Sequence, residues 1–500
     1  MLKMGIIKRQ GLKSTVVTYI GMVIGYVNLL WILPLCLTTE QIGLTRVLVD
    51  AGFLFSYFAV LGMNGTIIKY FPKFYDVDKK HNGFHFLMLG VPLAGFLIFC
   101  FFFFLFKKPI IDYFSENSAL LNQYAYLLIP FTFLLLFISL LDTYASALYR
   151  IVVPKILKEI LLKIFISCIC LLFYFKYYNF NIFILLFFLG YLLILFLQFI
   201  YTQKLEPFKI KPNFSFIDKD LKAEMITYSL YMILGGIGGV IVTKIDSIML
   251  NHYQGLAAAG VYTTAFFIAT VIEAPGRSLV QISQPVVSEA LISNDIPKLN
   301  QLYKKTSILQ FMAGCFIFLG IWMNIDNVFK IMPNGQEFAA GKYVILFVAF
   351  CKLIDALTSI NMVILNTSKY FRVTFYFLIL LAIMTIICNV IFIPMYGLLG
   401  AAFSAFITLS IYNFICVSYV YWKFKISPFS TGTIKVILIT LLVYAIIYFI
   451  PTMGNPYSDL LLRSVFITLI FCGLAYFFKA SEDVNLLVEN SLSKIKSFRK

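Results

Sequence analysis

The stretch that decides the fold is MITYSLYMILGGIGGVIVTKIDSIML, from Met225 to Leu250. It is long enough and apolar enough to cross a bilayer as a helix. At 100° per residue, one stripe of that helix collects Tyr228, Gly235, Gly239, Thr243 and Asp246. An ionisable residue inside a span marks a candidate functional site. The stretch therefore predicts a spanning helix with one apolar side and one small, polar side that ends in an acid.

Lys244 lies in the same stretch but points away from this stripe, into an arc of isoleucines. It is also close to the predicted outer end of the helix. A lysine side chain is long enough to carry its ammonium group to the membrane interface while its stem stays among apolar groups. We therefore expect Lys244 to reach the outer interface and to take no part in a site.

Similar apolar runs recur over the whole chain. The 500 residues are 61% hydrophobic and only 13% charged, against roughly 25% charged residues in a soluble domain. This composition predicts an all-α polytopic membrane protein with about 14 transmembrane helices. The expected spans are residues 15–37, 44–68, 84–106, 121–148, 154–175, 179–201, 225–250, 257–280, 306–325, 343–366, 372–393, 398–421, 432–451 and 459–478.

The distribution of basic residues indicates on which side of the membrane each connecting segment lies. Net charge is +17, from 40 basic and 23 acidic residues. With the N-terminus placed in the cytoplasm, and with residues near the span ends counted with the adjoining segment, 29 of the 40 fall on the predicted inner side, 6 on the outer side and 5 within spans. Because basic residues are enriched in cytoplasmic loops, this bias predicts both termini in the cytoplasm. The clusters are short and lie between apolar runs, which disfavours a nucleic-acid partner.

The longest polar segment, Thr202 to Glu224, divides the predicted spans into two groups. A stripe with Gly21, Gly25 and Asn28 in the first span parallels that of 225–250, which suggests a pseudo-twofold repeat. The predicted organisation is an N-terminal six-helix bundle at 1–203, a cytoplasmic linker at 204–224, a C-terminal six-helix bundle at 225–424, two extra transmembrane helices at 425–480 and a cytoplasmic tail at 481–500.

Other spans also carry ionisable and aromatic residues on single stripes. The candidates are Arg46, Asp50 and Tyr57 in span 44–68, Asp142 in span 121–148, Tyr262, Phe266, Glu273 and Arg277 in span 257–280, and Lys352 and Asp355 in span 343–366. A lone charge at mid-bilayer costs about 3 kcal/mol or more, so these groups are expected to pair. Two alternatives to a functional site remain: an ion pair that only holds helices together, and a side chain that reaches the membrane interface. They apply above all to Arg46. The deeper positions of Glu273, Arg277, Lys352 and Asp355 favour a polar cavity.

Helix breakers fall where a moving helix would bend. Gly235, Gly239 and Pro275 are the hinge candidates. The nine cysteines form no CxxC motif and no cluster with histidine, so no metal site is expected. No GxxxxGK[ST] motif is present. We therefore expect neither a cofactor nor an enzyme, and bending helices around charged groups favour transport by alternating access.

Two segments carry a family resemblance. TEQIGLTRVLVDAGFLFSYFAVLGMNGTIIKYFPKF (Thr39 to Phe74) and KIDSIMLNHYQGLAAAGVYTTAF (Lys244 to Phe266) look like the second span and the hairpin of spans 7 and 8 in one transporter family. With the predicted span number and topology, the chain resembles the polysaccharide transporter (O-antigen/oligosaccharide flippase) family of the multidrug/oligosaccharidyl-lipid/polysaccharide flippase superfamily.

The resemblance implies a flippase of the bacterial cytoplasmic (inner) membrane. Its substrate would be an undecaprenyl pyrophosphate-linked oligosaccharide, moved from the cytoplasmic to the periplasmic leaflet for polysaccharide, O-antigen (lipopolysaccharide) or capsule synthesis. Arg277 and Lys352, then Arg46, would neutralise the pyrophosphate. The carboxylates Asp50, Asp142, Asp246, Glu273 and Asp355 would hold these cations or bind a coupling cation. Tyr57, Tyr262 and Phe266 would stack on sugars, and other polysaccharide assembly proteins are expected partners.

Two alternatives stay open. The five acidic candidates are balanced by five bases, which are the three basic candidates together with Lys163 and Lys244. This balance leaves room for a cation-coupled multidrug or small-molecule exporter of the same superfamily. A membrane O-antigen polymerase is disfavoured because the sequence has no long outer loop.

Overall fold

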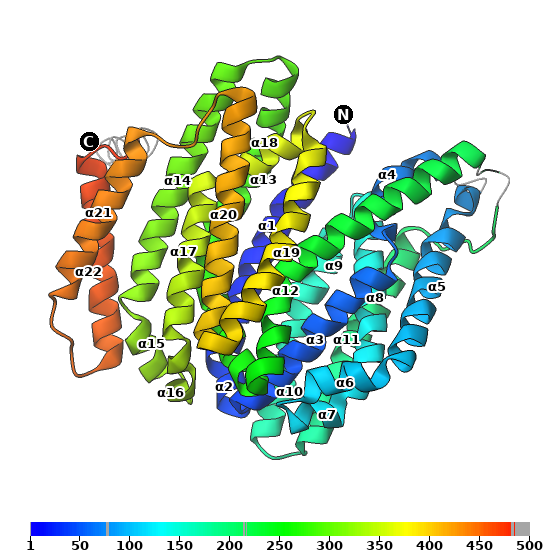
Figure 1. Cartoon of the computed structure of the whole chain (residues 1–500), viewed down its shortest axis with the longest axis horizontal. Helices are drawn as coiled ribbons and strands as arrows, with labels where there is room; N and C mark the ends of the chain where they lie inside the picture. The colour runs from blue at the N-terminus through cyan, green and yellow to red at the C-terminus, as the bar shows by residue number, and fades with distance from the viewer. Residues whose placement is uncertain (1, 77–79, 214–215, 217, 482–484, 486–500) are drawn as a thin grey trace, which may run out of the picture. The chain divides into compact units, whose positions relative to one another are not determined.

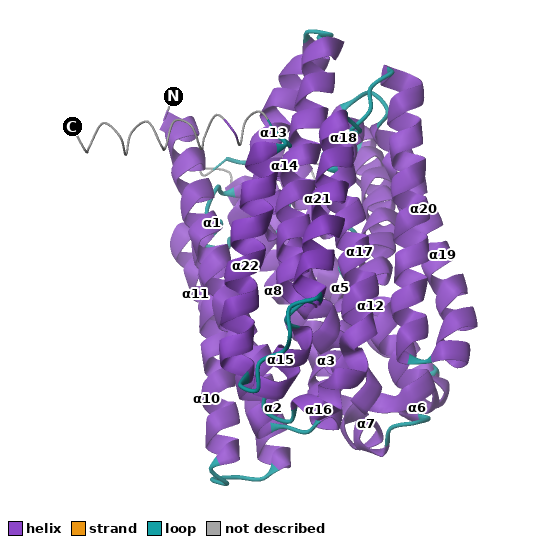
Figure 2. Cartoon of the chain, turned by 90° about the vertical axis from the view of Figure 1, so that its left-hand side faces the viewer, coloured by secondary structure: helices purple, strands orange, loops and turns teal. Residues whose placement is uncertain are grey.

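A computed structural model describes residues 2–76, 80–213, 216, 218–481 and 485. Within these ranges the chain consists of helices joined by short connections, with no strand (Figures 1 and 2). The expected all-α class is therefore confirmed. Nearly all of the predicted tail at 481–500 lies outside the described residues.

The chain forms two compact units. The first comprises Met1–Thr263 with Asn389–Leu398, and the second comprises Thr264–Cys388 with Leu399–Lys500. Contacts thus group Met225–Thr263 with the N-terminal part of the chain. The finer division into two six-helix bundles, a linker and two extra helices stays a prediction.

The helices of the first unit follow one another closely in sequence (Figure 1). They are α1 Leu2–Val27, η1 Asn28–Ile32, α2 Leu33–Cys36, α3 Thr39–Ala59, α4 Met63–Phe74, η2 Lys80–Gly83, α5 Phe84–Leu105, α6 Lys107–Ser115, α7 Ala119–Tyr124, η3 Ala125–Leu127, α8 Leu128–Ala147, α9 Val152–Ile156, η4 Leu157–Leu161, α10 Leu162–Tyr174, α11 Phe180–Leu205 and most of α12 Lys219–Ala269.

The second unit begins in the last turns of α12. Its other helices are η6 Thr270–Glu273, α13 Ala274–Ile292, α14 Ile296–Trp322, α15 Ile325–Ile331, α16 Gly335–Phe338, η7 Ala339–Gly341, α17 Lys342–Thr358, α18 Asn361–Thr367, most of α19 Phe371–Tyr396, α20 Leu398–Phe424, α21 Thr431–Tyr448 and α22 Pro456–Phe477.

Eleven helices in the described ranges are long and apolar enough to cross a membrane, or 12 if each bent pair is one span. The expected number of 14 is therefore not confirmed. Two regions account for the difference between 12 and 14. Predicted spans 225–250 and 257–280 both lie in the element α12, which counts as one span, and predicted span 154–175 carries four charged residues, Lys155, Lys158, Glu159 and Lys163.

The break inside α12 lies at Gly255, whose φ of 83° suits glycine and few other residues. A Cβ atom there would lie 2.7 Å from the carbonyl oxygen of Asn117. Just before the break, the Asn251 amide donates to the carbonyl of Phe114 at 2.7 Å and accepts from Ser118 at 2.9 Å. The end of the stretch 225–250 is thus held by the α6–α7 connection.

A π-helical segment also precedes Pro34 in the first span. Proline lacks an N–H and its ring crowds the carbonyl four residues earlier. The π-helical turn of η1, Asn28–Ile32, comes just before Pro34. Asn28 itself donates to the carbonyl of Lys163 at 2.8 Å and accepts from Ser167, which links η1 to α10. The bend in this span therefore has a local cause in the sequence.

The outer faces of several helices are apolar. On α5, for example, Phe101, Phe102 and Phe104 are each more than half exposed. An apolar band of this size would be unfavourable in water and is what lipid contact requires. Buried aromatic cores lie behind such faces, around Tyr70 and Tyr144 in the first unit and around Tyr303 in the second. The chain is therefore a multi-pass membrane protein.

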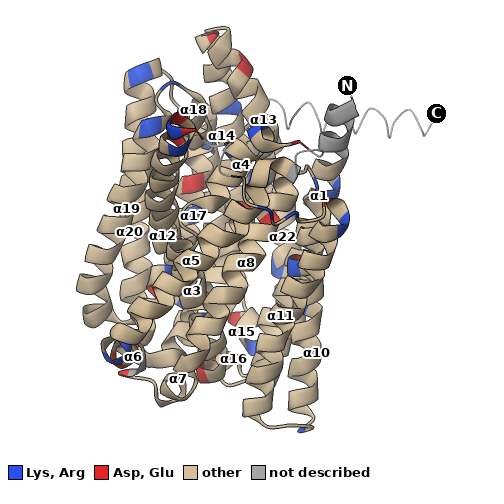
Figure 3. Cartoon of the chain, turned by 90° about the vertical axis from the view of Figure 1, so that its right-hand side faces the viewer, with Lys and Arg blue, Asp and Glu red and all other residues tan. Residues whose placement is uncertain are grey.

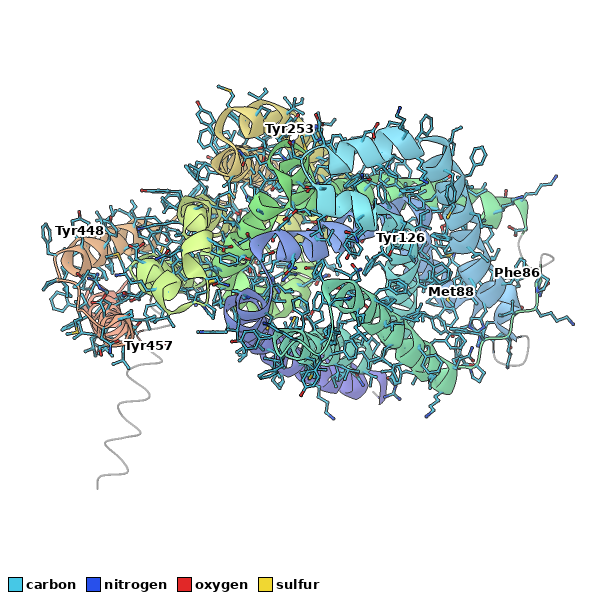
Figure 4. The ribbon with its side chains drawn as sticks, turned by 90° about the horizontal axis from the view of Figure 1, so that it is seen from below. Phe86, Met88, Tyr126, Tyr253, Tyr448 and Tyr457 are labelled. Carbon is cyan, nitrogen blue, oxygen red and sulfur yellow. The ribbon has the colours of Figure 1, made fainter. Side chains whose placement is uncertain are left out.

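A buried ion pair holds the start of α22 Pro456–Phe477 to the connection that precedes it and to α15. Asp459 accepts from Arg463 at 2.9 Å, from Asn327 of α15 at 2.6 Å and from the backbone N–H of Met453 at 3.1 Å. The two charged side chains are 2% and 7% exposed. Tyr448 and Tyr457 on the hairpin of α21 and α22 are exposed (Figure 4), as is common for tyrosines at a membrane interface.

Replacing Arg463 with alanine is expected to lower the free energy of unfolding by about 3 kcal/mol, because Asp459 would keep a buried charge without its cation. Thermal unfolding of the detergent-purified protein measures this change. Lys342→Ala is the control, because Lys342 pairs with Asp326 in an exposed position of the same unit. Its loss should cost below about 1 kcal/mol, and equal effects of both variants would contradict the prediction.

Candidate functional site

Most of the helix surface carries no charge (Figure 3). The charged candidates that do lie within spans are mostly gathered into four polar clusters, three in the first unit and one in the second. Each cluster is named below by its carboxylate: Asp50, Asp246, Asp142 and Glu273.

The Asp50 cluster joins α3 to α12. Lys244 donates to Oδ1 of Asp50 at 2.6 Å, and Ser247 donates to Oδ2 at 2.8 Å. The Lys244 ammonium also lies 5.9 Å from the centroid of the Phe53 ring. The expectation that Lys244 would snorkel to the outer interface is therefore wrong. A carboxylate on the neighbouring helix neutralises the ammonium where it is.

Arg46 lies one helical turn before Asp50 on α3 and is half-buried. Within the described part of the chain, no ion pair or hydrogen bond joins its guanidinium to a carboxylate. Tyr57 lies further along the same helix, where its ring packs against Gly236 of α12. A Cβ atom at Gly236 would be 2.7 Å from a ring carbon. Helix α3 thus presents an unpaired cation near one end and an aromatic ring deeper in the span.

The Asp246 cluster holds a carboxylate with neutral donors. Asp246 is 5% exposed, and its oxygens accept from the Tyr262 hydroxyl at 2.8 Å and the Asn389 amide at 2.7 Å. Among the described residues no Lys or Arg forms an ion pair with it. Buried carboxylates are normally paired with a cation or protonated. Asp246 is therefore a candidate to bind either a cation or a proton. Tyr262 is itself buried here, and its stacking on a sugar stays a prediction.

The Asp142 cluster ties α8 to η4 and α11. Lys158 forms an ion pair with one oxygen of Asp142, and Gln198 donates to the other at 2.7 Å. Lys158 is not among the candidates identified from the sequence, where no spacing rule connects it with Asp142. The pair neutralises Asp142 within the first unit.

The Glu273 cluster brings four candidates together in the second unit. One oxygen of Glu273 accepts from Lys352 at 2.5 Å and the other accepts from Arg277 at 3.1 Å. Lys352 also lies 3.9 Å from Asp355, and its ammonium is 5.7 Å from the centroid of the Phe266 ring. Two cations and two carboxylates share this cluster, so its net charge is zero when all are ionised.

Irregular backbone positions these groups. Glu273 ends the 3-10 turn η6, and Pro275 lies in the first turn of α13, where proline is tolerated. Helix α17 ends at Thr358, and the chain bends by 53° into α18. Ser359, at the bend, has φ 51° and ψ −110°, a sparsely populated conformation that is often found near functional sites. The amide of Asn413 donates to Asp355 at 2.7 Å and fixes its orientation.

The three hinge candidates differ in their surroundings. Gly235 and Gly239 have helical backbone angles, because the interruption of α12 is at Gly255. A Cβ atom added at Gly239 would meet no atom within 4 Å, so this glycine is not required for close packing. Pro275 directly follows a change from 3-10 to α-helix. The hinge role of all three stays a prediction.

Sequence reasoning missed the neutral partners of these clusters. Asn389, Asn413, Gln198 and Ser247 each bond a carboxylate inside the helices. The amide side chains within apolar spans are themselves a signal in the sequence. Burying an amide in a membrane costs free energy unless it forms a hydrogen bond, so each one predicts a partner. The signal did not indicate which helix supplies that partner.

Comparisons with known proteins identify the family of the chain and, separately, its fold. A family described as "Polysaccharide biosynthesis protein" matches residues 7–291. The probable low-salt glycan biosynthesis flippase Agl15 of Haloferax volcanii is 21% identical over 256 residues, which cover 50% of this chain and 52% of the relative. The chain thus aligns with about half the length of this curated relative.

Solved structures share the arrangement of helices. A lipid II flippase, MurJ, in an inward closed conformation superposes with a TM-score of 0.72 at 15% identity, covering 93% of this chain and 98% of that one. An inward-facing multidrug resistance transporter of the MATE family gives a TM-score of 0.58 at 13% identity, covering 81% and 94%. These similarities show the fold. Because the family match extends over more than half of its residues, the chain belongs to the polysaccharide biosynthesis protein family.

Proposed function

We propose that this protein flips a lipid-linked oligosaccharide of the undecaprenyl pyrophosphate type from the cytoplasmic to the periplasmic leaflet by alternating access. It would serve polysaccharide, O-antigen or capsule synthesis in a bacterial cytoplasmic membrane, with both termini inside. The observation that carries this proposal is Arg46, a half-buried guanidinium within a membrane helix that forms no ion pair among the described residues. A pyrophosphate cannot cross hydrocarbon unneutralised, and a guanidinium binds phosphate oxygens bidentately.

The Glu273 cluster supplies two further cations for such a substrate. The side chain of Arg277 is 55% exposed and shares Glu273 with Lys352, which is only 11% exposed. A phosphate would therefore capture Arg277 most easily, because that guanidinium exchanges one anionic partner for another at little desolvation cost. Lys352 would remain with the carboxylates and keep the cluster together.

The Asp246 cluster is the candidate site for a coupling cation or proton. Its carboxylate is buried and bonded to neutral donors. Binding of a cation there would relieve the desolvation cost of the charge, and its release on the other side of the membrane would drive the return step. A contribution of other polysaccharide assembly proteins stays a prediction.

Reconstitution into proteoliposomes tests the function. A fluorescent undecaprenyl pyrophosphate oligosaccharide is placed in the membrane, and dithionite added outside reports the fraction exposed over time. We expect the protein to accelerate exchange between leaflets, and a proton or sodium gradient to change the rate. Exchange no faster than in protein-free vesicles would refute the flippase proposal, and rates independent of both gradients would refute coupling.

A second function has support in the charge balance of the clusters. The Glu273 cluster is neutral, and Asp246 offers a cation site without needing a phosphate, as suits a cation-coupled exporter of small molecules. The same vesicles distinguish the two functions. Uptake of a cationic dye against a proton or sodium gradient, with no acceleration of glycan-lipid exchange, would establish the exporter.

A further inference from the structure

A cationic and aromatic patch of the second unit lies where α18 leads into α19 and where α20 ends, and it shares no residue with the Glu273 cluster. It consists of Lys369 and Arg372 at the start of α19 and Lys423 and Lys425 at the end of α20, together with Tyr370 and Trp422. These residues belong to the second unit. Figure 3 shows Lys and Arg gathered at this end of the helices. None of the proposed transport steps uses this interfacial patch.

The patch is continuous, although its residues come from two connections. The ammonium groups of Lys369 and Lys423 each lie 5.3 Å from the centroid of the same Tyr370 ring. Lys423 is also 3.4 Å from the centroid of the Trp422 ring and 5.8 Å from that of Tyr419. Cation–π contacts of this kind hold an ammonium group in place without neutralising it. The rings therefore fix the positions of two positive charges and leave both available to an anion.

The four cations have no acidic partner within the described part of the chain. Other lysines of this unit are paired, such as Lys298 with Glu289 at 2.9 Å and Lys342 with Asp326 at 2.7 Å. Lys369, Arg372 and Lys425 are exposed, and Lys423 is half-buried among the rings. Two ammonium groups held at one ring, with two further cations close to them in sequence and no counter-charge among the described residues, attract an anion from outside the chain.

The aromatic residues indicate where that anion lies. Trp422 is 61% exposed and Phe371 is 54% exposed, at the ends of helices that cross the membrane. Exposed tryptophan and tyrosine at helix ends lie at the level of lipid headgroups, where the phosphates of the membrane surface are also found. Basic clusters next to a span bind anionic lipids, with each cation contributing to affinity.

We propose that this interfacial patch is a binding site for the phosphate of an anionic phospholipid headgroup, with Lys369 and Lys423 as its central ligands. Arg372 and Lys425 lie at its rim, and the rings of Tyr370 and Trp422 orient the ammonium groups. The site is independent of the proposed flipping reaction, so either proposal can fail without the other.

Trp422 itself reports the binding. The chain has three tryptophans, so Trp31→Phe and Trp322→Phe together leave Trp422 as the fluorophore. This variant is reconstituted in vesicles of phosphatidylcholine that contain an increasing fraction of either brominated phosphatidylglycerol or brominated phosphatidylcholine. We expect quenching at lower mole fraction with the anionic lipid. Removal of each central cation should lower that preference about fivefold, as follows from the usual contribution of one basic residue at a membrane surface.

Three variants in this background decide the outcome. Lys369→Gln with Lys423→Gln should remove most of the preference, Lys369→Arg with Lys423→Arg should keep it, and Lys298→Gln should leave it unchanged. Equal quenching by both lipids, or the same preference in the double glutamine variant, would overturn the proposal. So would a response of Trp422 to inorganic phosphate in detergent that matches its response to the anionic lipid, since the site would then take free phosphate.

Discussion

Replacement of Arg46 with alanine should slow the flipping of a lipid-linked oligosaccharide in proteoliposomes by at least about tenfold, with little change in folding stability. The loss follows from one charge-assisted hydrogen-bonding group, worth about 1.5–3 kcal/mol when the partner is charged. Stability should hold because Arg46 forms no ion pair within the described residues, so its removal leaves no orphaned carboxylate. Initial exchange rates and thermal unfolding of the same preparation measure the two quantities.

Two further variants identify the cause of the Arg46 effect. Arg46→Lys retains the charge but loses the bidentate geometry, so an intermediate rate is expected. Lys107→Ala removes an exposed cation from the first unit, outside the four clusters, and should flip at the wild-type rate. If Arg46→Ala matches Lys107→Ala, then Arg46 does not contact the substrate.

The parts of the fold that follow from local composition were predictable. Apolar runs located the helices, and the i,i+4 spacing of Glu273 and Arg277 predicted a pair that the structure contains. The i,i+3 spacing of Lys352 and Asp355 likewise placed both near one another. These contacts depend on one helix at a time, for which sequence spacing is sufficient.

Contacts between helices were harder to predict. A helical wheel gives the direction of Lys244 but does not say that α3 presents Asp50 to it. The π-helical segments η1 and η4 add a further difficulty, because one inserted residue rotates the face of the following helix by about 100°. Lys158 lies in η4 and pairs with Asp142 of α8, a contact between two separate helical elements. Partner choice is a tertiary property that no single span encodes.

Replacement of Lys352 with methionine should lower the free energy of unfolding by about 3 kcal/mol and also reduce flipping. The ammonium group is 11% exposed and serves both Glu273 and Asp355, so its loss leaves two carboxylates around one partly exposed guanidinium. Removing one partner of a buried ion pair is strongly destabilising because the other charge stays desolvated. Methionine preserves much of the side-chain volume, so packing is changed little.

The double variant Lys352→Met with Glu273→Gln distinguishes a structural role of Lys352 from a role in binding. It leaves one guanidinium, on Arg277, and one carboxylate, on Asp355, so the cluster remains neutral, and about 2 kcal/mol of the lost stability should return because Glu273, the acid bonded directly to Lys352, no longer carries a charge. Flipping should stay low, because a pyrophosphate would still lack the second cation. Recovery of flipping together with stability would show that Lys352 only neutralises Glu273 and takes no part in binding the phosphate.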